Sequence, residues 1–290
     1  MRIERTGICR LRQRVWRPID SHRMRMAVAL LFVLGTVRVW AQTASTRIDA
    51  NEEVMQWTIE GTQRKAVVFS PSKKSDAGKE PVLFAFHWHG GTMLEAADGL
   101  RFQERWPEAI VVYMQGLPTK SRTDPRGVEP GWQQEPGQSG DRDLKFFDAV
   151  LETLRSKFPV NDHRIYATGF SNGGTFTYLL WDARGKTFAA FAPVAGQIFP
   201  ALHLTEPRPI LHIAGTQDLL VPFEDQLKSI GMARDVNGVS EKGKSCGEGC
   251  TIYPSTKGAP VMTYIHPDGH VYPAGASSMI VKFFRSHTAE

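Results

Sequence analysis

Short, nearly unbroken apolar runs recur along this chain, and segments with helical spacing separate them. The runs occupy residues 81–87, 109–114, 164–169, 188–196, 209–215 and 261–266. Unbroken apolar runs of this length are typical of strands that are covered on both faces of a sheet. The apolar positions 144, 147, 150, 151, 154 and 158 instead follow a helical period. Further helices are expected over 100–106, 175–181, 223–233 and 277–284.

The first part of the pattern differs, because apolar and polar residues alternate over 55–59 and an apolar run returns over 65–69 after a turn. This predicts an antiparallel hairpin at the N-terminal side of the sheet. Strands that alternate with helices after such a start predict the α/β class, with a mostly parallel, doubly wound sheet and helices on both faces. We see no internal repeat and no second domain, so residues 42–290 are expected to form one domain.

One junction in this pattern carries a chemical motif. The run over 164–169 leads into Gly169-Phe170-Ser171-Asn172-Gly173, and an apolar helix is expected to follow. A Gly-x-Ser-x-Gly motif between a buried strand and a helix is typical of a nucleophile elbow. The tight turn holds the serine in a strained backbone conformation, and the flanking glycines avoid a clash where strand and helix approach. The motif predicts Ser171 as a nucleophile.

A serine hydroxyl needs a histidine to accept its proton and a carboxylate to orient that histidine. With this elbow, the acid and then the histidine follow the serine along the chain. Asp218 comes directly after the run 209–215, and a helix N-cap is its alternative role. His270 lies in a Pro- and Gly-marked turn after the last strand, and His266 is its rival. We therefore predict the triad Ser171, Asp218 and His270.

The negative oxygen of a tetrahedral intermediate needs backbone N–H donors. Asn172, at the start of the helix after the serine, is predicted to supply one. Gly91, in the turn-rich loop 87–92, is predicted to supply the other, with Thr92 next in line. His89 is expected to order this loop and contact substrate. An H-x-H metal pair with His87 is the alternative, but no third ligand is evident, so no metal and no cofactor are predicted.

Residues 115–141 form a long segment crowded with glycine, proline and charged residues. A loop of this length in a compact domain is usually functional or disordered. We expect this loop and its Trp132 to shape the substrate pocket. Packing of Trp132 in the core is the alternative.

Two cysteines, Cys246 and Cys250, lie outside the N-terminal 41 residues. A pair of this kind in an exported protein favours a disulfide that closes a small loop. A metal or redox pair is the alternative, but no second Cys/His pair stands at ligand spacing.

The charge of the chain is concentrated at its N-terminus. The 290 residues carry a formal net charge of +5, yet the first 41 contain nine arginines and two acidic residues. The remainder is therefore slightly acidic, with a net charge of −2. We infer no nucleic-acid surface from the basic isoelectric point.

The first 41 residues have the pattern of a secretory signal peptide. Two arginines precede the apolar run 26–34, and Val39-Trp40-Ala41 ends in a small residue before the expected cleavage site. We expect a signal peptide over 1–41 and a secreted or periplasmic protein without stable membrane association after cleavage. An uncleaved anchor or an organelle transit peptide is the alternative. The start methionine is left open between Met1, Met24 and Met26.

Four motifs together resemble a known group of enzymes. They are His89-Gly90-Gly91, Gly169-Phe170-Ser171-Asn172-Gly173-Gly174, Gly215-Thr216-Gln217-Asp218 and Gly269-His270-Val271-Tyr272-Pro273. In this order they are similar to those of the secreted polyhydroxybutyrate depolymerase and feruloyl esterase family of the α/β-hydrolase superfamily. The resemblance implies the α/β-hydrolase fold and the same triad. Asp268 and Tyr272 depart from the family pattern, which leaves the substrate subgroup open.

The sequence thus predicts a serine carboxylesterase that hydrolyses feruloyl, acetyl or hydroxyalkanoate esters through an acyl-enzyme. Its partner is a small or polymeric ester, and its oligomeric state is not given by the pattern. A serine peptidase of the prolyl-oligopeptidase type is one alternative. A non-catalytic protein that binds a polymer or carbohydrate is the other.

Overall fold

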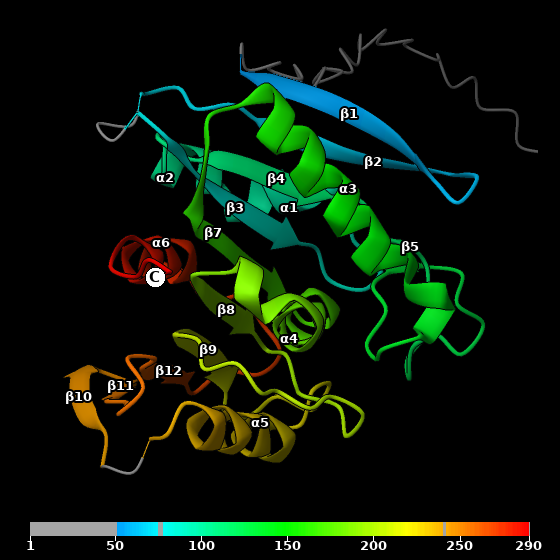
Figure 1. The fold of residues 1–290 in the computed structure, drawn as a ribbon. Helices are drawn as coiled ribbons and strands as arrows, with labels where there is room; N and C mark the ends of the chain where they lie inside the picture. Colours follow the sequence, from blue (N-terminus) through cyan, green and yellow to red (C-terminus); the bar gives the residue numbers. More distant parts are fainter. Residues whose placement is uncertain (1–50, 75–77, 240–241, 290) are drawn as a thin grey trace, which may run out of the picture. The chain divides into compact units, whose positions relative to one another are not determined.

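The apolar runs form the centre of a large twisted sheet (Figure 1). The computed structural model describes residues 51–74, 78–239 and 242–289, so the predicted signal peptide over 1–41 lies outside the described residues. In spatial order the strands of the described sheet are β1 (Glu52–Ile59), β2 (Thr62–Phe69), β4 (Ile110–Met114), β3 (Glu80–Phe86), β7 (Val160–Phe170), β8 (Ala190–Val194), β9 (Ile210–Gly215), β12 (Val261–His266), β11 (Cys250–Tyr253) and β10 (Lys244–Gly247).

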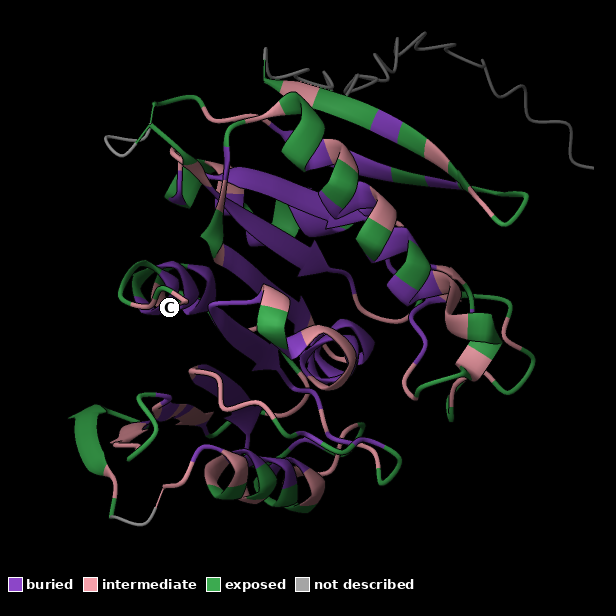
Figure 2. Ribbon diagram, in the orientation of Figure 1, coloured by how far each residue is buried: buried purple, intermediate pink, exposed green. Residues whose placement is uncertain are grey.

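Strand directions confirm the predicted topology. All neighbours from β4 to β12 pair in parallel, and β1, β2 and β4 pair antiparallel. β10 and β11 form a second antiparallel hairpin against β12. The sequence pattern does not predict this hairpin, because its strands are short and every residue of β10 is exposed (Figure 2).

Burial explains why the central strands read as unbroken apolar runs. Every residue of β4, β8 and β9 is buried, since both faces of these strands are covered. Figure 2 shows this buried centre between helices.

Helices cover the sheet on two faces, each with its own apolar core. One core receives side chains from α3 (Arg142–Lys157), α4 (Asn172–Arg184) and α5 (Phe223–Val236). The other receives side chains from α1 (Met93–Leu100), α2 (Phe102–Arg105) and α6 (Ala276–Arg285). Across the described ranges, no helix is long and apolar enough to cross a membrane.

The long segment 115–141 is ordered against the sheet rather than loose. A small ribbon of β5 (Leu117–Pro118) and β6 (Pro130–Gly131) closes its first part. Its second part is held by the buried Asp143, whose carboxylate pairs with Arg64 at 2.7 Å and accepts the Gln133 N–H at 2.9 Å. The Gln133 side chain in turn accepts the Asp143 N–H at 3.0 Å. These contacts fix the backbone beside Trp132.

Candidate active site

Ser171 lies at the turn between β7 and α4. Its backbone has φ 58° and ψ −118°, a conformation that non-glycine residues rarely adopt. A Cβ atom at Gly173 would lie 2.4 Å from the Phe86 carbonyl oxygen, and one at Gly169 would lie 2.4 Å from the Gly173 backbone. Only glycine fits at either position, so the sequence motif and the strained turn have the same cause.

The structure brings the three predicted triad residues together in one hydrogen-bonded row. Ser171 Oγ lies 2.7 Å from His270 Nε2, and His270 Nδ1 lies 2.8 Å from Asp218 Oδ2. Because a carboxylate only accepts, Nδ1 carries the ring proton and Nε2 faces the serine as a base. The His270 ring also stacks on Phe170, with ring centroids 5.0 Å apart.

Each member of this row follows its own parallel strand. Ser171 follows β7, Asp218 follows β9 and His270 follows β12, so the carboxyl ends of the strands bring them to one edge of the sheet. The acid loop is also bound to the histidine loop, since Gln217 N–H donates to the Asp268 carbonyl at 3.1 Å.

The alternatives for the acid and the base fit less well. The N-cap of α5 is Pro222, and Asp218 Oδ1 instead accepts the Leu220 and Val221 N–H groups at 2.9 Å each. His266 is buried with its Nδ1 3.5 Å from Asp268 Oδ2, and it lines a different cavity from the one above Ser171.

Asn172 lies at the start of a helix, and its role as an oxyanion donor stays a prediction. It is the first residue of α4, where a helix leaves backbone N–H groups without intrahelical partners. Its side chain is fixed, because Oδ1 accepts the Trp132 N–H at 2.7 Å and Nδ2 donates to the Trp132 carbonyl at 3.1 Å.

Gly91 does not fit the second donor position, and that prediction is corrected. Its N–H donates to the Trp88 carbonyl at 3.0 Å, and the neighbouring Gly90 N–H donates to Pro130 at 2.7 Å. Neither glycine lines the cavity above Ser171, whereas His89 does. Within the described part of the chain, the His89 N–H donates to no other group. His89 is therefore the better candidate from this loop.

The sequence predicts that His89 orders its own loop, but its side chain contacts the segment 115–141 instead. Its Nε2 lies 3.4 Å from Asp124 Oδ2, and its ring packs so closely on Gly131 that a Cβ there would lie 2.6 Å from Nδ1. Asp124 also accepts the Glu129 and Gly127 N–H groups, and these hydrogen bonds lower the pKa of its carboxyl.

The metal-pair alternative for His87 and His89 is not supported by the contacts of His87. Its Nε2 accepts the Gly116 N–H at 2.9 Å, and its Nδ1 lies 2.7 Å from the Trp88 carbonyl. Burial lowers the pKa of His87 to about 4. Both ring nitrogens are engaged in holding the loop.

Trp132 is a core residue, so the prediction that its side chain shapes the pocket is wrong. The indole is fully buried, stacks on Phe176 of α4 with centroids 5.2 Å apart, and donates to the His87 carbonyl at 2.9 Å. Only the backbone of Trp132 contributes to the site, through its two hydrogen bonds to the Asn172 side chain. The alternative reading of packed core is the one the structure supports.

A cavity of about 400 Å³ opens above Ser171. Part of its wall is aromatic, from Trp88, Phe170 and Phe199. Another part is polar and includes Arg122, whose guanidinium donates to the carbonyl of Leu220, a second lining residue. Arg122 belongs to the segment 115–141 that the sequence predicts to shape the pocket, and Ser121, Thr123 and Gln134 of that segment also line the cavity. Phe199 lies in a loop without a recognisable motif, so the sequence alone does not single it out.

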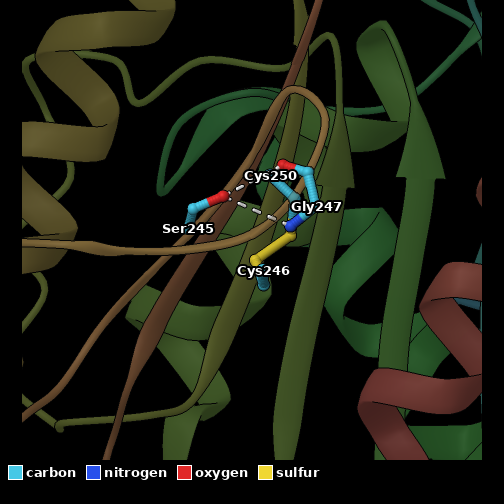
Figure 3. The surroundings of a disulfide bond; sticks show 4 residues. All are labelled: Ser245, Cys246, Gly247 and Cys250. Atoms are coloured by element: carbon cyan, nitrogen blue, oxygen red, sulfur yellow. Dashed lines mark hydrogen bonds between the residues drawn. A yellow bond between two sulfur atoms is a disulfide. The ribbon is translucent and has the colours of Figure 1, made fainter.

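Cys246 and Cys250 form a disulfide, as predicted (Figure 3). It joins β10 to β11 at the edge of the sheet, and Figure 3 shows Ser245 and Gly247 beside it. The disulfide lies outside the residues that line the Ser171 cavity.

Comparisons with known proteins place the chain beside esterases. No family model matches the chain. It is 26% identical over 202 residues to "Probable feruloyl esterase C" of Aspergillus clavatus, covering 67% of this chain and 68% of that protein. It is 26% identical over 167 residues to "Feruloyl esterase C" of Emericella nidulans, covering 56% and 57%. The aligned region thus spans about two thirds of the first relative and just over half of the second.

Among solved structures, an acetyl xylan esterase from Aspergillus awamori superposes with a TM-score of 0.62 at 14% identity, covering 80% of this chain and 99% of that one. A thermostable esterase superposes with a TM-score of 0.58. These likenesses confirm the α/β-hydrolase fold and the resemblance to feruloyl esterases.

Proposed function

We propose that this α/β-hydrolase, which resembles curated feruloyl esterases, is a serine carboxylesterase with the triad Ser171, His270 and Asp218. The likeness to curated esterases supports carboxylic ester hydrolysis, as predicted from sequence. The observation that carries the triad is the row of hydrogen bonds from the Asp218 carboxylate to the Ser171 hydroxyl, on a strained turn beneath an open cavity.

In the first half of the reaction, Ser171 Oγ attacks the ester carbonyl carbon while His270 Nε2 takes the hydroxyl proton. Asp218 holds the ring orientation and stabilises the imidazolium. The carbonyl oxygen becomes negative and accepts the N–H groups of Asn172 and His89. As the ester C–O bond breaks, His270 returns the proton to the leaving alcohol oxygen, and the acyl group stays on Ser171.

In the second half, water replaces the alcohol. His270 removes a proton from the water as its oxygen attacks the acyl carbon, and the same N–H groups stabilise the second intermediate. Its collapse breaks the bond to Ser171 Oγ, which regains a proton from His270. The products are a carboxylic acid and the free enzyme.

The wall of the cavity favours an aromatic acyl group. Trp88 and Phe170 pack edge to face with centroids 6.1 Å apart, and Phe199 contributes a third ring. An aryl acid bound among these rings buries apolar area and gains aromatic contacts. We therefore place feruloyl esters before acetyl and hydroxyalkanoate esters. The secreted or periplasmic setting rests on the pattern over 1–41.

An ester panel tests the substrate class. Methyl ferulate, p-nitrophenyl acetate, acetylated xylan and short hydroxybutyrate oligomers are compared by kcat/KM with a peptide p-nitroanilide. We expect methyl ferulate to exceed acetylated xylan and the hydroxybutyrate oligomers by about tenfold or more, because an aryl acyl group can stack on these rings and the acyl groups of the other two cannot. Turnover of the anilide at the rate of the esters would favour a peptidase. Failure with every ester would favour a binding protein.

A further inference from the structure

Three buried polar side chains lie behind the triad and take no part in the mechanism given above. They are Gln226 on α5, His212 on β9 and Tyr178 on α4, and each is 0% exposed. A buried polar group is costly unless it is hydrogen-bonded, so three in contact need a physical reason.

These side chains continue the triad's row of hydrogen bonds into the core. Gln226 Nε2 lies 3.0 Å from Asp218 Oδ2, the same oxygen that His270 contacts. Gln226 Oε1 lies 3.1 Å from His212 Nε2. His212 Nδ1 lies 2.6 Å from the Tyr178 hydroxyl. The row therefore runs without a gap from Tyr178 to Ser171.

The donor and the acceptor of every hydrogen bond in this row can be assigned by starting from the Asp218 carboxylate. The Gln226 atom beside Asp218 Oδ2 also lies 2.7 Å from the Val221 carbonyl, and since both neighbours only accept, it must be the amide nitrogen. Gln226 Oε1 then faces His212, whose Nε2 must carry a proton. Burial lowers the pKa of His212 to about 4, so the ring is neutral and its Nδ1 accepts. Burial raises the pKa of Tyr178, which keeps its proton and donates.

As a result, every acceptor position of the Asp218 carboxylate is filled. Oδ1 accepts two backbone N–H groups, and Oδ2 accepts Gln226 and His270. A carboxylate has about four acceptor sites, so all are filled and the carboxylate cannot rotate away from His270.

We propose that Gln226 is a positioning residue for Asp218, and that His212 and Tyr178 hold its amide so that the N–H, not the carbonyl, faces the carboxylate. The inference rests on the proposed function, since it assigns these residues a role through the triad. With the amide reversed, a carbonyl oxygen would face the carboxylate and repel it. The buried row prevents that reversal.

Gln226→Met tests the first part. The variant keeps the side-chain length but removes the donor to Asp218, so we expect kcat for p-nitrophenyl acetate to fall about tenfold while KM changes less than about twofold. Asn237→Ala is the matched control. Asn237 caps the same helix with a fully buried amide that, among the described residues, bonds only the Arg208 backbone. Its loss is expected to lower Tm without lowering kcat.

A double-mutant cycle with Tyr178→Phe tests the second part. In the wild-type background this change frees the His212 tautomer and is expected to lower kcat about threefold. In the Gln226→Met background no amide remains to be held, so the same change is expected to have no further effect on kcat. A role in packing alone would instead give the same loss in both backgrounds.

Two results would overturn the inference: a folded Gln226→Met enzyme with wild-type kcat, or equal effects of Tyr178→Phe in the two backgrounds. Folding is checked by circular dichroism, and Gln226→Leu replaces the methionine variant if that one does not fold. Failure of the proposed function is a separate result, because it would appear as a wild-type activity that does not depend on Ser171.

Discussion

Replacing Ser171 by alanine is expected to lower kcat/KM for p-nitrophenyl acetate by about 10⁵-fold, because no other group in the row can form the acyl-enzyme. The hydroxyl contacts only His270 among side chains of the described residues, and alanine leaves the turn's backbone unchanged. The loss should therefore come without a change in Tm larger than about 2 °C. Steady-state kinetics and differential scanning calorimetry measure the two quantities.

Ser156→Ala serves as the control for this variant. Ser156 is exposed near the end of α3, and its hydroxyl donates to the Thr153 carbonyl at 2.8 Å. Its replacement should leave kcat/KM unchanged within about twofold. If Ser171→Ala kept more than a hundredth of the wild-type activity, the acyl-enzyme mechanism at this serine would be wrong.

Asp218→Asn is expected to lower kcat by about 10⁴-fold, through the tautomer of His270. The backbone N–H groups of Leu220 and Val221 require an acceptor at Oδ1, so the asparagine must keep its oxygen there. Its amide N–H groups then face His270 Nδ1, which has to accept. The ring proton moves to Nε2, and the nitrogen that faces Ser171 can no longer take a proton.

Asp225→Asn is the matched control for this change. Asp225 lies in the first turn of α5, and its carboxylate pairs with Lys228 at the surface rather than with a member of the row of hydrogen bonds. We expect its kcat to stay within about twofold of the wild-type value. Equal losses for the two variants would indicate that charge near α5, rather than the orientation of His270, controls the rate.

The sequence predicts the triad because each member follows an apolar strand. In a parallel sheet the carboxyl ends of strands meet at one edge, so Ser171, Asp218 and His270 are close in space although they are far apart along the chain. The central strands are predictable for a related reason, since burial on both faces leaves an unbroken apolar run. The hairpin of β10 and β11 has no such run and is therefore missed.

The remaining errors concern groups whose roles depend on contacts across the fold. Which backbone N–H of the loop 87–92 is free depends on the turn that Gly91 closes on Trp88, and glycine content alone does not reveal it. Trp132 is buried because Phe176 offers it a stacking surface from α4. Gln226 reaches Asp218 from α5, and its other amide atom meets His212 of β9. Local sequence patterns do not predict contacts of this kind between side chains.

Covalent trapping shows whether Ser171 is the nucleophile. The folded protein is treated with a fluorophosphonate, and its intact mass and proteolytic peptides are measured. With Ser171 as the nucleophile, we expect one adduct per chain, located on the peptide that contains Ser171 and absent from Ser171→Ala. A folded wild-type protein that takes up no label, or that carries the label on another residue, would contradict this assignment.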